Sequence, residues 1–261
     1  ANPKSSTGRL DIFTRVITDY AAEFDRIPRG YKGLLYAEIS PLTFSIKVRM
    51  GTKLSQLRLR RGSPPHYETA MRRLHENNPL VAAKDVDVVD ITKTGVAFTV
   101  DLVGDTNTGI MGYKAKQHAD VIDVERADHY DLHDFWEPLY SRSGRNLILD
   151  PNDFYILASR ETVSVPPNHA AEMRAYDTFV GEFRVHYAGF FDPGFGHDGN
   201  GNGSRAVLEV RSHDVPFVLE DGQRVGRLVY ERLTAVPDQL YGAQIGSSYQ
   251  KQGLKLSKHF K

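Results

Sequence analysis

A polar run near the start of the sequence, KSSTGR at residues 4–9, has the residue types of a site for an oxyanion. The hydroxyl groups of Ser5 and Ser6 can donate hydrogen bonds to an anion, and Arg9 adds a fixed positive charge. A Ser-rich turn, or a helix cap with a solvated Arg, would show the same letters. The run is not a Walker loop, because the pattern G-x-x-x-x-G-K-[ST] occurs nowhere in the sequence.

A second stretch, VHYAGFFDPGFG at residues 185–196, indicates an extended segment that ends in a turn. Pro193 fixes φ, Gly194 accepts the left-handed region, and the side chain of Asp192 can bond the backbone that follows. The small pair Ala188-Gly189 leaves space beside the strand, as is needed where a flat ligand approaches the backbone. An ordinary hairpin with a small-residue bulge is the alternative.

Two glutamates occupy matching places in what looks like an internal repeat. LLYAEI followed by MGTKLSQLRL corresponds to AVLEV followed by DGQRVGRLVY, so Glu38 and Glu209 are equivalent. A glutamate on an alternating strand ordinarily faces solvent. Its recurrence in both copies favours a carboxylate placed for a purpose, although shared ancestry would also produce it.

Composition limits the class of protein. The length allows one large domain or two ordinary ones with well-filled cores. Acidic and basic residues are equal in number, 33 of each, so no positive face is available to draw the chain to nucleic acid or to a membrane. The absence of cysteine excludes disulfides, thiol catalysis and zinc sites that need thiolate. We recognise no signal peptide or bilayer-spanning apolar run, and expect a cytoplasmic protein.

Short runs of β-branched and aromatic residues, separated by Gly, Pro and Asn-Asp, predict a mainly β protein built as a sandwich or barrel. The predicted strands lie in LYAEISPLTFSIKVRMG, VVDITKTGVAFTVDLVG, DFYILASRETVSVP, RAVLEVRS and GRLVYERL. One helix is predicted in HYETAMRRLHEN, which places Tyr67, Ala70, Met71 and Leu74 on one face.

These elements predict a first β unit over residues 1–62, a helical connector over 63–82 and a second β unit over 83–261. The lone tryptophan, Trp136, is expected to anchor a core. In the second unit several strands precede the position that matches KSSTGR, whereas almost nothing precedes it in the first. By analogy we expect roughly 80–100 further residues upstream in the natural protein.

The motifs KSSTGR, the Glu-bearing strand, VHYAGFFDPGF and YGAQIGSSYQKQG resemble, in combination and order, the deoxycytidine triphosphate deaminase branch of the dUTPase-like superfamily. The resemblance covers most of the chain. It implies two tandem distorted jelly-roll β units, the first incomplete at its N-terminus. The family's usual single-domain form is trimeric, with zinc-free sites between neighbouring subunits, and we expect a homo-oligomer here.

The resemblance further implies a catalytic group made of the Ser and Arg of a Ser-Ser-x-x-Arg motif, the Ala before the Asp-Pro-Gly turn, and the strand Glu. The first unit has the Ser-Ser-x-x-Arg motif but lacks the hairpin, while the second has RAYDTF in place of that motif. The second unit keeps the hairpin and Glu209, so each unit has lost what the other retains. This predicts one composite site that combines the two units, which come from one chain or from two. Its catalytic residues are Ser5, Arg9, Ala188 and Glu209, with Glu38 as a lesser candidate.

The substrate-binding residues that we predict include Asp192 of the turn and residues of the C-terminal tail, which in the family folds over the phosphates. They are Lys4, Ser6, His186, Gly189, Asp192, Tyr241, Tyr249, Lys251 and Gln252. A mobile basic terminus is the alternative for the tail. Ser248 stands where the family usually has Lys, for which Lys251 can compensate. Mg²⁺ is expected to accompany the nucleotide triphosphate, with no zinc.

The predicted function is zinc-independent hydrolysis of dCTP to dUTP and ammonia, in the synthesis of pyrimidine deoxynucleotides that lead to dTTP. Deamination at C4 needs an activated water and two proton transfers, which one buried carboxylate can supply in sequence. Zinc deaminases need cysteine ligands that this sequence lacks. Two alternatives stay open: a dUTPase or bifunctional deaminase and diphosphatase, and a non-catalytic nucleotide-binding regulator.

Overall fold

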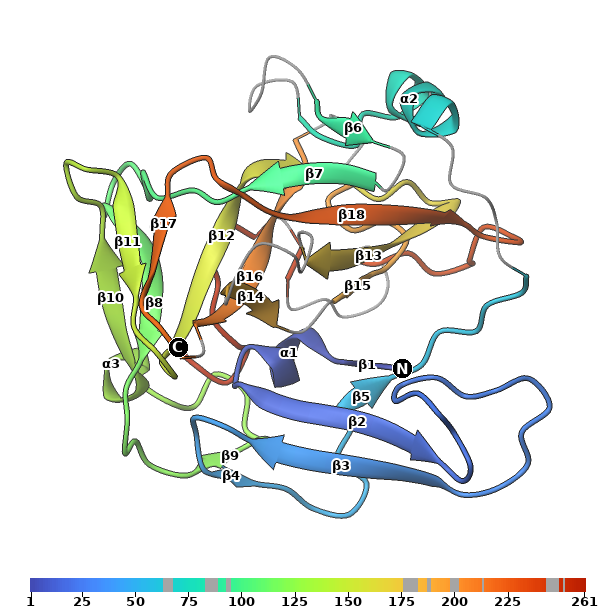
Figure 1. Cartoon of the computed structure of the whole chain (residues 1–261), viewed down its shortest axis with the longest axis horizontal. Coiled ribbons are helices and arrows are strands. Elements are labelled where there is room, and N and C mark those ends of the chain that lie inside the picture. The colour runs from blue at the N-terminus through green and yellow to red at the C-terminus, as the bar shows by residue number, and fades with distance from the viewer. Residues whose placement is uncertain are drawn as a thin grey trace. The chain divides into compact units, whose positions relative to one another are not determined.

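A computed structural model of the chain describes residues 1–62, 68–82, 89–92, 95–175, 183–186, 189–197, 202–212, 214–242, 249–250 and 252–261, with backbone alone at 175 and 183–186. The chain forms two compact units (Figure 1). Unit 1 comprises Ala1–Arg61, Ala115–Glu137 and Leu256–Lys261, and unit 2 comprises Gly62–Lys114 and Pro138–Lys255. The first break, after Arg61, lies beside the boundary expected at 62, but two later segments return to unit 1.

Unit 1 is built from short paired strands around an aromatic core. Its elements are β1 (Asn2–Pro3), α1 (Ser5–Gly8), β2 (Ile12–Thr18), β3 (Leu35–Pro41), β4 (Ile46–Lys47), β5 (Ser55–Gln56), β9 (Ile122–Asp123) and α3 (Leu132–Phe135). β1 pairs with β5 and β2 with β3, both antiparallel, whereas β4 and β9 are parallel.

The core of unit 1 draws on all three of its chain segments. Trp136 is fully buried, with its ring 5.2 Å from that of Phe44 and 5.9 Å from that of Phe260. Phe135 lies 5.4 Å from both Tyr130 and Phe260. Such edge-on ring pairs add to the free energy gained by burial alone. The prediction that Trp136 anchors a core is therefore confirmed.

Unit 2 contains two five-stranded sheets in the described chain, with strand orders β10-β8-β12-β16-β14 and β15-β13-β18-β7-β6, and a separate pair, β11-β17. Its strands are β6 (Ile91–Thr92), β7 (Gly95–Thr99), β8 (Ile110–Ala115), β10 (Trp136–Tyr140), β11 (Asn146–Leu149), β12 (Phe154–Val163), β13 (His169–Ala175), β14 (Phe183–His186), β15 (Phe190–Phe191), β16 (Ser204–Ser212), β17 (Phe217–Glu220) and β18 (Arg224–Arg232). The last residue of β8 and the first two residues of β10, Trp136 and Glu137, are counted with unit 1. The prediction of a mainly β protein is confirmed.

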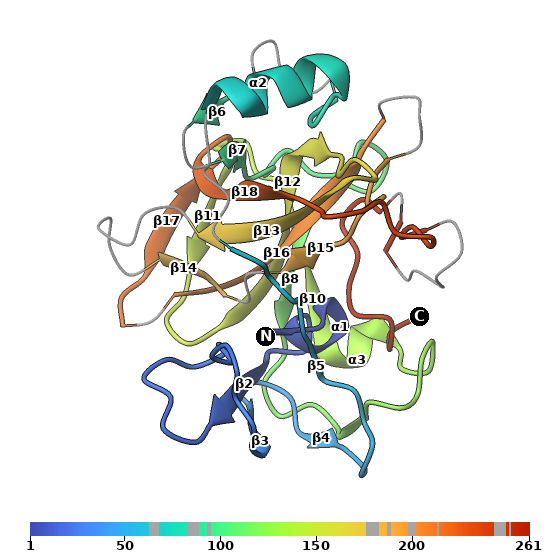
Figure 2. The ribbon, with the colours of Figure 1, turned by 90° about the vertical axis from the view of Figure 1, so that its right-hand side faces the viewer.

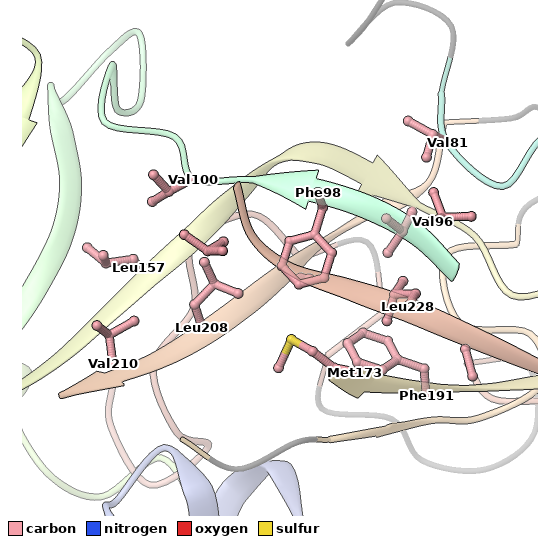
Figure 3. Packing of buried hydrophobic residues seen from close by; sticks show 14 of the residues in the cluster. Val81, Val96, Phe98, Val100, Leu157, Met173, Phe191, Leu208, Val210 and Leu228 are labelled. Carbon is pink, nitrogen blue, oxygen red and sulfur yellow. The ribbon is translucent and has the colours of Figure 1, made fainter. Parts of the chain in front are cut away.

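Apolar side chains from both sheets of unit 2 form a single core cluster (Figure 3). Leu157 and Leu208 come from β12 and β16, while Phe98 and Leu228 come from β7 and β18. In β16 the residues from Ala206 to Ser212 are all buried, so this central strand is covered on both faces. A side chain on β16 therefore meets protein rather than water.

The predicted helix is α2 (Glu68–Asn77), which lies beside β6 (Figure 2). Met71 is buried and Leu74 packs against the core cluster of unit 2, as the apolar face predicts. Ala70, assigned to the same face, is exposed because the helix lies on the surface and buries only a narrow stripe. Tyr67 lies outside the described residues.

The hairpin stretch carries the chain from one sheet of unit 2 to the other. β14 pairs with β16, whereas β15 pairs with β13 of the second sheet. On the way, the carbonyl of Gly189 accepts a hydrogen bond of 3.0 Å from the backbone N–H of Met173. The two halves of the quoted motif thus belong to different sheets, and the turn at Asp192 follows the crossing.

Candidate functional site

The Ser-Ser-x-x-Arg motif forms a single helical turn, α1, in unit 1. Lys4 occupies the N-cap position without a side-chain hydrogen bond, so the serines that follow do not serve as the helix cap. The backbone N–H of Arg9 donates to the carbonyl of Ser5 at 3.0 Å, and Arg9 is only 3% exposed. Ser5, by contrast, is half-buried, one helical turn before Arg9.

A neighbouring loop fixes this turn in place. The carbonyl of Leu54 accepts a hydrogen bond from the backbone N–H of Lys4 and another from Oγ1 of Thr7, each 2.9 Å long. The side chains of Lys4 and Ser6 line a cavity of about 250 Å³ within unit 1. Burial lowers the pKa of Lys4, and the charges of Lys258 and Lys53 lower it further.

The two repeated glutamates have opposite environments. Glu38 lies on β3, opposite Arg15 on β2; its side chain is 46% exposed and its carboxylate is 3.9 Å from the Arg15 guanidinium. Glu209 lies on the central strand β16 and is 4% exposed. The surface-facing interpretation therefore fits Glu38 and does not fit Glu209.

The neighbours of Glu209 come from strands on either side of β16. The register places Ile156 of β12 on one side of Glu209 and the backbone of His186 of β14 on the other. A carboxyl group sealed inside a sheet is costly unless the group has polar partners or a chemical role. Glu209 and His186, both predicted site residues, are thus adjacent across one strand pair.

The Asp-Pro-Gly turn has the predicted form. The backbone N–H of Phe195 donates to the carbonyl of Asp192 at 3.0 Å, and Gly194 has φ +95°. A proline at the second position and a left-handed glycine at the third are characteristic of a type II turn. The turn is held against the rest of unit 2 by a bond of 3.0 Å from the N–H of Gly194 to the carbonyl of Val165.

Residues of the C-terminal tail bind this turn. The amide group of Gln250 donates to the carbonyl of Gly194 and accepts from the N–H of Gly196, both at 3.2 Å. The N–H of Tyr241 donates to the carbonyl of Pro193 at 2.9 Å, and its ring lies 5.7 Å from that of Phe195. Sequence reasoning missed Gln250, although a glutamine amide can both donate to a carbonyl and accept from an N–H of a backbone turn.

The tail residues from Tyr249 to Lys255 that the structure describes also contact other parts of the chain. Gln252 is buried and its side chain donates to the carbonyl of Arg205 at 3.0 Å, while the N–H of Arg205 donates back to the carbonyl of Gln252 at 3.1 Å. Tyr249 is buried, and the ammonium group of Lys255 lies 5.9 Å from the centre of its ring. These described residues of the tail are held in place by specific contacts.

Some predicted site residues fall outside what the structure describes. Ala188 and Lys251 are among them, as is Ser248, and only the backbone of His186 is described. Ser5 and Arg9 belong to unit 1, whereas Asp192 and Glu209 belong to unit 2. The composite site therefore stays a prediction. In the described part of the chain, no three His, Asp or Glu side chains gather in a way that could hold a metal ion.

Two family models match this chain, and together they identify its family. A model of the "2′-deoxycytidine 5′-triphosphate deaminase (DCD), C-terminal domain" matches residues 67–260, and the corresponding N-terminal domain model matches residues 1–63. Within the described residues, no helix has the length and apolarity to cross a membrane. The chain belongs to the 2′-deoxycytidine 5′-triphosphate deaminase family, and the resemblance inferred from the sequence is confirmed.

A crystal structure of 2′-deoxycytidine 5′-triphosphate deaminase from Agrobacterium tumefaciens is similar with a TM-score of 0.83 and 58% identity, over 91% of this chain and 69% of that chain. This likeness confirms the dUTPase-like fold. The "dCTP deaminase, dUMP-forming" of Halobacterium salinarum is 36% identical over 113 residues, 42% of this chain and 54% of that protein. The "dCTP deaminase" of Haloarcula marismortui is 29% identical over 140 residues, 52% and 68% of the two chains. The chain thus matches about half of the first relative's length.

Proposed function

We propose that the protein catalyses the hydrolytic deamination of dCTP, without zinc, as a step in the synthesis of pyrimidine deoxynucleotides that lead to dTTP. The observation that carries the proposal is the buried carboxyl group of Glu209 on β16, in a chain matched by both domain models of the deaminase family. In contrast to Glu38, Glu209 is screened from solvent, as a proton-transferring carboxyl group should be.

In the proposed reaction, water adds to C4 of the cytosine ring while Glu209 accepts one of its protons and passes it to N3. Glu209 then takes the hydroxyl proton of the adduct and gives it to the amino group, so that the C4–N bond breaks and ammonia leaves. Uracil keeps the water oxygen at C4. Ser5 orients the attacking water or the leaving amine, and Arg9 sets the charge and orientation of the carboxylate.

The remaining predicted residues serve binding. Ala188 and Gly189 leave room for the flat pyrimidine, and the backbone near the Asp192 turn reads its edge. The bonds of Gln250 to Gly194 and Gly196 support a role for the tail in closing this part of the site. Mg²⁺ enters with the triphosphate as part of the substrate. The composite site draws on two β units, either within one chain or between copies in a homo-oligomer.

The product is the open point of the proposal, because the names of the relatives differ. The Halobacterium salinarum relative is named dUMP-forming, and the Haloarcula marismortui relative is not. A dUMP-forming enzyme must also hydrolyse the bond at the α-phosphate after deamination. We keep dUTP and ammonia as the expected products, with the bifunctional reaction as the alternative.

The test is to incubate the full chain with dCTP and Mg²⁺, then to measure ammonia and separate dUTP from dUMP. Ammonia released in equal amount to dUTP supports the proposal as stated. Ammonia with dUMP supports the bifunctional alternative. Tight binding of dCTP without release of ammonia contradicts the catalytic proposal and identifies a nucleotide-binding regulator.

A further inference from the structure

The C-terminal tail contacts the Asp-Pro-Gly turn at two points within unit 2. The backbone N–H of Tyr241 donates to the carbonyl of Pro193, and the side-chain amide of Gln250 bonds the turn at Gly194 and Gly196. Tyr241 and Gln250 are nine residues apart in the sequence, yet both meet the same short turn. The conformation of the turn and the position of the tail therefore depend on each other.

The side chain of Gln250 matches the turn chemically. Its Nε2 donates to the carbonyl of Gly194 and its Oε1 accepts from the N–H of Gly196, both at 3.2 Å. An amide offers a donor and an acceptor side by side, whereas a carboxylate lacks the donor and an ammonium group lacks the acceptor. The contact therefore depends on the amide group of Gln250, and a side chain of equal length without that group cannot replace it.

The atoms that Gln250 binds belong to the buried part of the turn. Gly194, Phe195 and Gly196 are buried, whereas Asp192 is exposed. A buried N–H that loses its acceptor is costly, because water cannot fully replace the lost hydrogen bond. Gln250 therefore fixes the buried part of the turn, while Asp192 at its start is accessible to a ligand.

A glycine in the tail leaves room for the Gln250 side chain. A Cβ added to Gly242 would lie 2.6 Å from Cδ and 2.7 Å from Cγ of Gln250. Gly242 directly follows Tyr241, which also bonds the turn. The amide of Gln250 is thus held in its orientation by close packing as well as by its two hydrogen bonds.

The tail has a second attachment two residues after Gln250. Gln252 exchanges two hydrogen bonds with the backbone of Arg205, which lies on β16 four residues before Glu209. Gln250 and Gln252 therefore tie the turn to the strand that carries Glu209. Both of these attached parts of unit 2 contain predicted site residues.

We propose that Gln250 is a positioning residue for the binding of dCTP. Its amide holds the Asp-Pro-Gly turn in the conformation that reads the pyrimidine edge, so the affinity for dCTP depends on the bonds from Gln250 to the turn. The inference rests on the proposed function, which supplies dCTP as the ligand and assigns its base to this turn. A turn that binds the base equally in the ground state and in the transition state affects KM and leaves kcat unchanged.

The test compares Gln250→Met with Gln223→Met in the full chain. Methionine keeps the approximate length of glutamine and removes the amide. Gln223 is the matched control, because it is also half-buried in unit 2 and its Oε1 accepts a bond of 3.0 Å from a backbone N–H, that of Glu220. Gln250→Met should raise KM for dCTP about tenfold at unchanged kcat, roughly the effect of one net hydrogen bond. Gln223→Met should change neither constant.

A second pair of variants and a second measurement keep the test independent of turnover. Gly242→Ala should displace the Gln250 side chain without altering it, and Gly109→Ala, also at a positive φ but with open space around it, is its control. Gln250→Met and Gly242→Ala should both accelerate amide exchange at Gly196 and weaken dCTP binding, measured by calorimetry in a Glu209→Gln background. Gly109→Ala should do neither.

The outcomes separate this inference from the proposed function. Faster exchange at Gly196 with unchanged affinity for dCTP would reduce Gln250 to a structural role and overturn the inference. Unchanged exchange in Gln250→Met would overturn it as well, because the amide would then not hold the turn. Wild-type protein that binds dCTP and releases no ammonia would contradict the proposed deamination alone, since the comparison of affinities needs no turnover.

Discussion

Glu38 and Glu209 each lie between apolar residues in the sequence, but their surroundings in the fold differ. In β3 most residues are exposed, and Glu38 faces Arg15 at the surface; in β16 both faces are covered, and Glu209 lies between β12 and β14. Periodicity identifies both positions as strand positions, but it cannot tell a central strand from an exposed one. The environment, set by the neighbouring strands, makes Glu209 the better candidate for proton transfer.

We expect Glu209→Gln to reduce the rate of ammonia release from dCTP at least 10²-fold, roughly the contribution of a positioned general base. The substitution keeps the shape of the side chain and removes its capacity to take a proton, so binding of dCTP should change little. Glu38→Gln is the matched control and should retain activity. If Glu38→Gln abolishes ammonia release while Glu209→Gln remains active, the assignment of the two copies is reversed.

His259 should make the stability of unit 1 depend on pH. Burial lowers its pKa below the usual 6.5, and Lys258 and Lys4 lower it further, against the opposing effects of the Val124 carbonyl and Glu125. Because the unfolded chain then binds a proton at higher pH than the folded one, the free energy of unfolding should fall as the pH drops through about 6.5, and level off below the folded pKa.

Urea unfolding at about pH 7.5 and about pH 5.5 measures this loss. His259→Gln should reduce the difference between the two conditions, whereas His133→Gln, at an exposed position of unit 1, should not. His75 and His169 of unit 2 also have pKa values lowered by burial, and add a loss in the same direction. An undiminished pH dependence in His259→Gln would contradict the assignment to His259.

At the scale of elements, the Asp-Pro-Gly turn depends on the left-handed backbone of Gly194 and on the close packing around that residue. Gly194 has φ +95°, and a Cβ there would lie 3.1 Å from Cβ of Leu240 and 3.2 Å from the nitrogen of Tyr241. Gly109, also in unit 2, has φ +71° and would meet only a Tyr140 ring atom at 4.0 Å. The two glycines share the backbone requirement and differ in the space around them.

We expect Gly109→Ala to cost about 1–2 kcal/mol, the penalty for an L-residue in the left-handed region. Gly194→Ala should cost about 1 kcal/mol or more beyond that, since Leu240 and Tyr241 must move. Urea unfolding measures the difference, and amide exchange at Gly196, whose N–H bonds Gln250, should accelerate only in Gly194→Ala. Equal costs would show that the contacts with Leu240 and Tyr241 are loose.

The turn and α2 could be predicted from sequence because their causes are local. Pro193-Gly194 sets its own dihedral angles, and the apolar stripe of α2 lies within ten residues. The meeting of the two ends of the chain in unit 1, where Lys4 and Lys258 line one cavity, could not be predicted in this way. Lys4 and Lys258 stand at opposite ends of the sequence. The basic residues of the final segment, KLSKHFK, look in the sequence like an ordinary solvated terminus. Only the path of the chain through unit 1 brings them together.

At the scale of the whole molecule, unit 1 is made from three separated chain segments. Phe260 is buried, and its ring lies 5.4 Å from Phe135 and 5.9 Å from Trp136. The N–H of Lys261 and the carbonyl of His259 bond the backbone of Tyr130. Strand patterns indicate where β segments lie but not which distant segment completes a core, so the return of residues 115–137 and 256–261 to unit 1 was not predicted.

We expect Phe260→Ala to destabilise unit 1 by about 3–5 kcal/mol, the usual cost of removing a buried aromatic ring. Trp136 is the only tryptophan of the chain and lies in this core, so its fluorescence reports on unit 1 during urea unfolding. Leu59→Ala, at a side chain of unit 1 that is 98% exposed, should change stability by less than about 0.5 kcal/mol. Similar midpoints for both variants would show that Phe260 does not hold the core together.

The use of Phe260 in the core of unit 1 has a consequence for biosynthesis. A ribosome adds roughly 5–20 residues per second, so the segment that ends at Arg61 waits roughly 10–40 s before Phe260 is made. Phe44 meets its ring partners Phe135 and Trp136 only when residues 115–137 have been made, and these two rings wait for Phe260 in turn. Unit 1 must therefore mature after unit 2 has been synthesised, and in the cell the nascent N-terminal segment should be a client for chaperones.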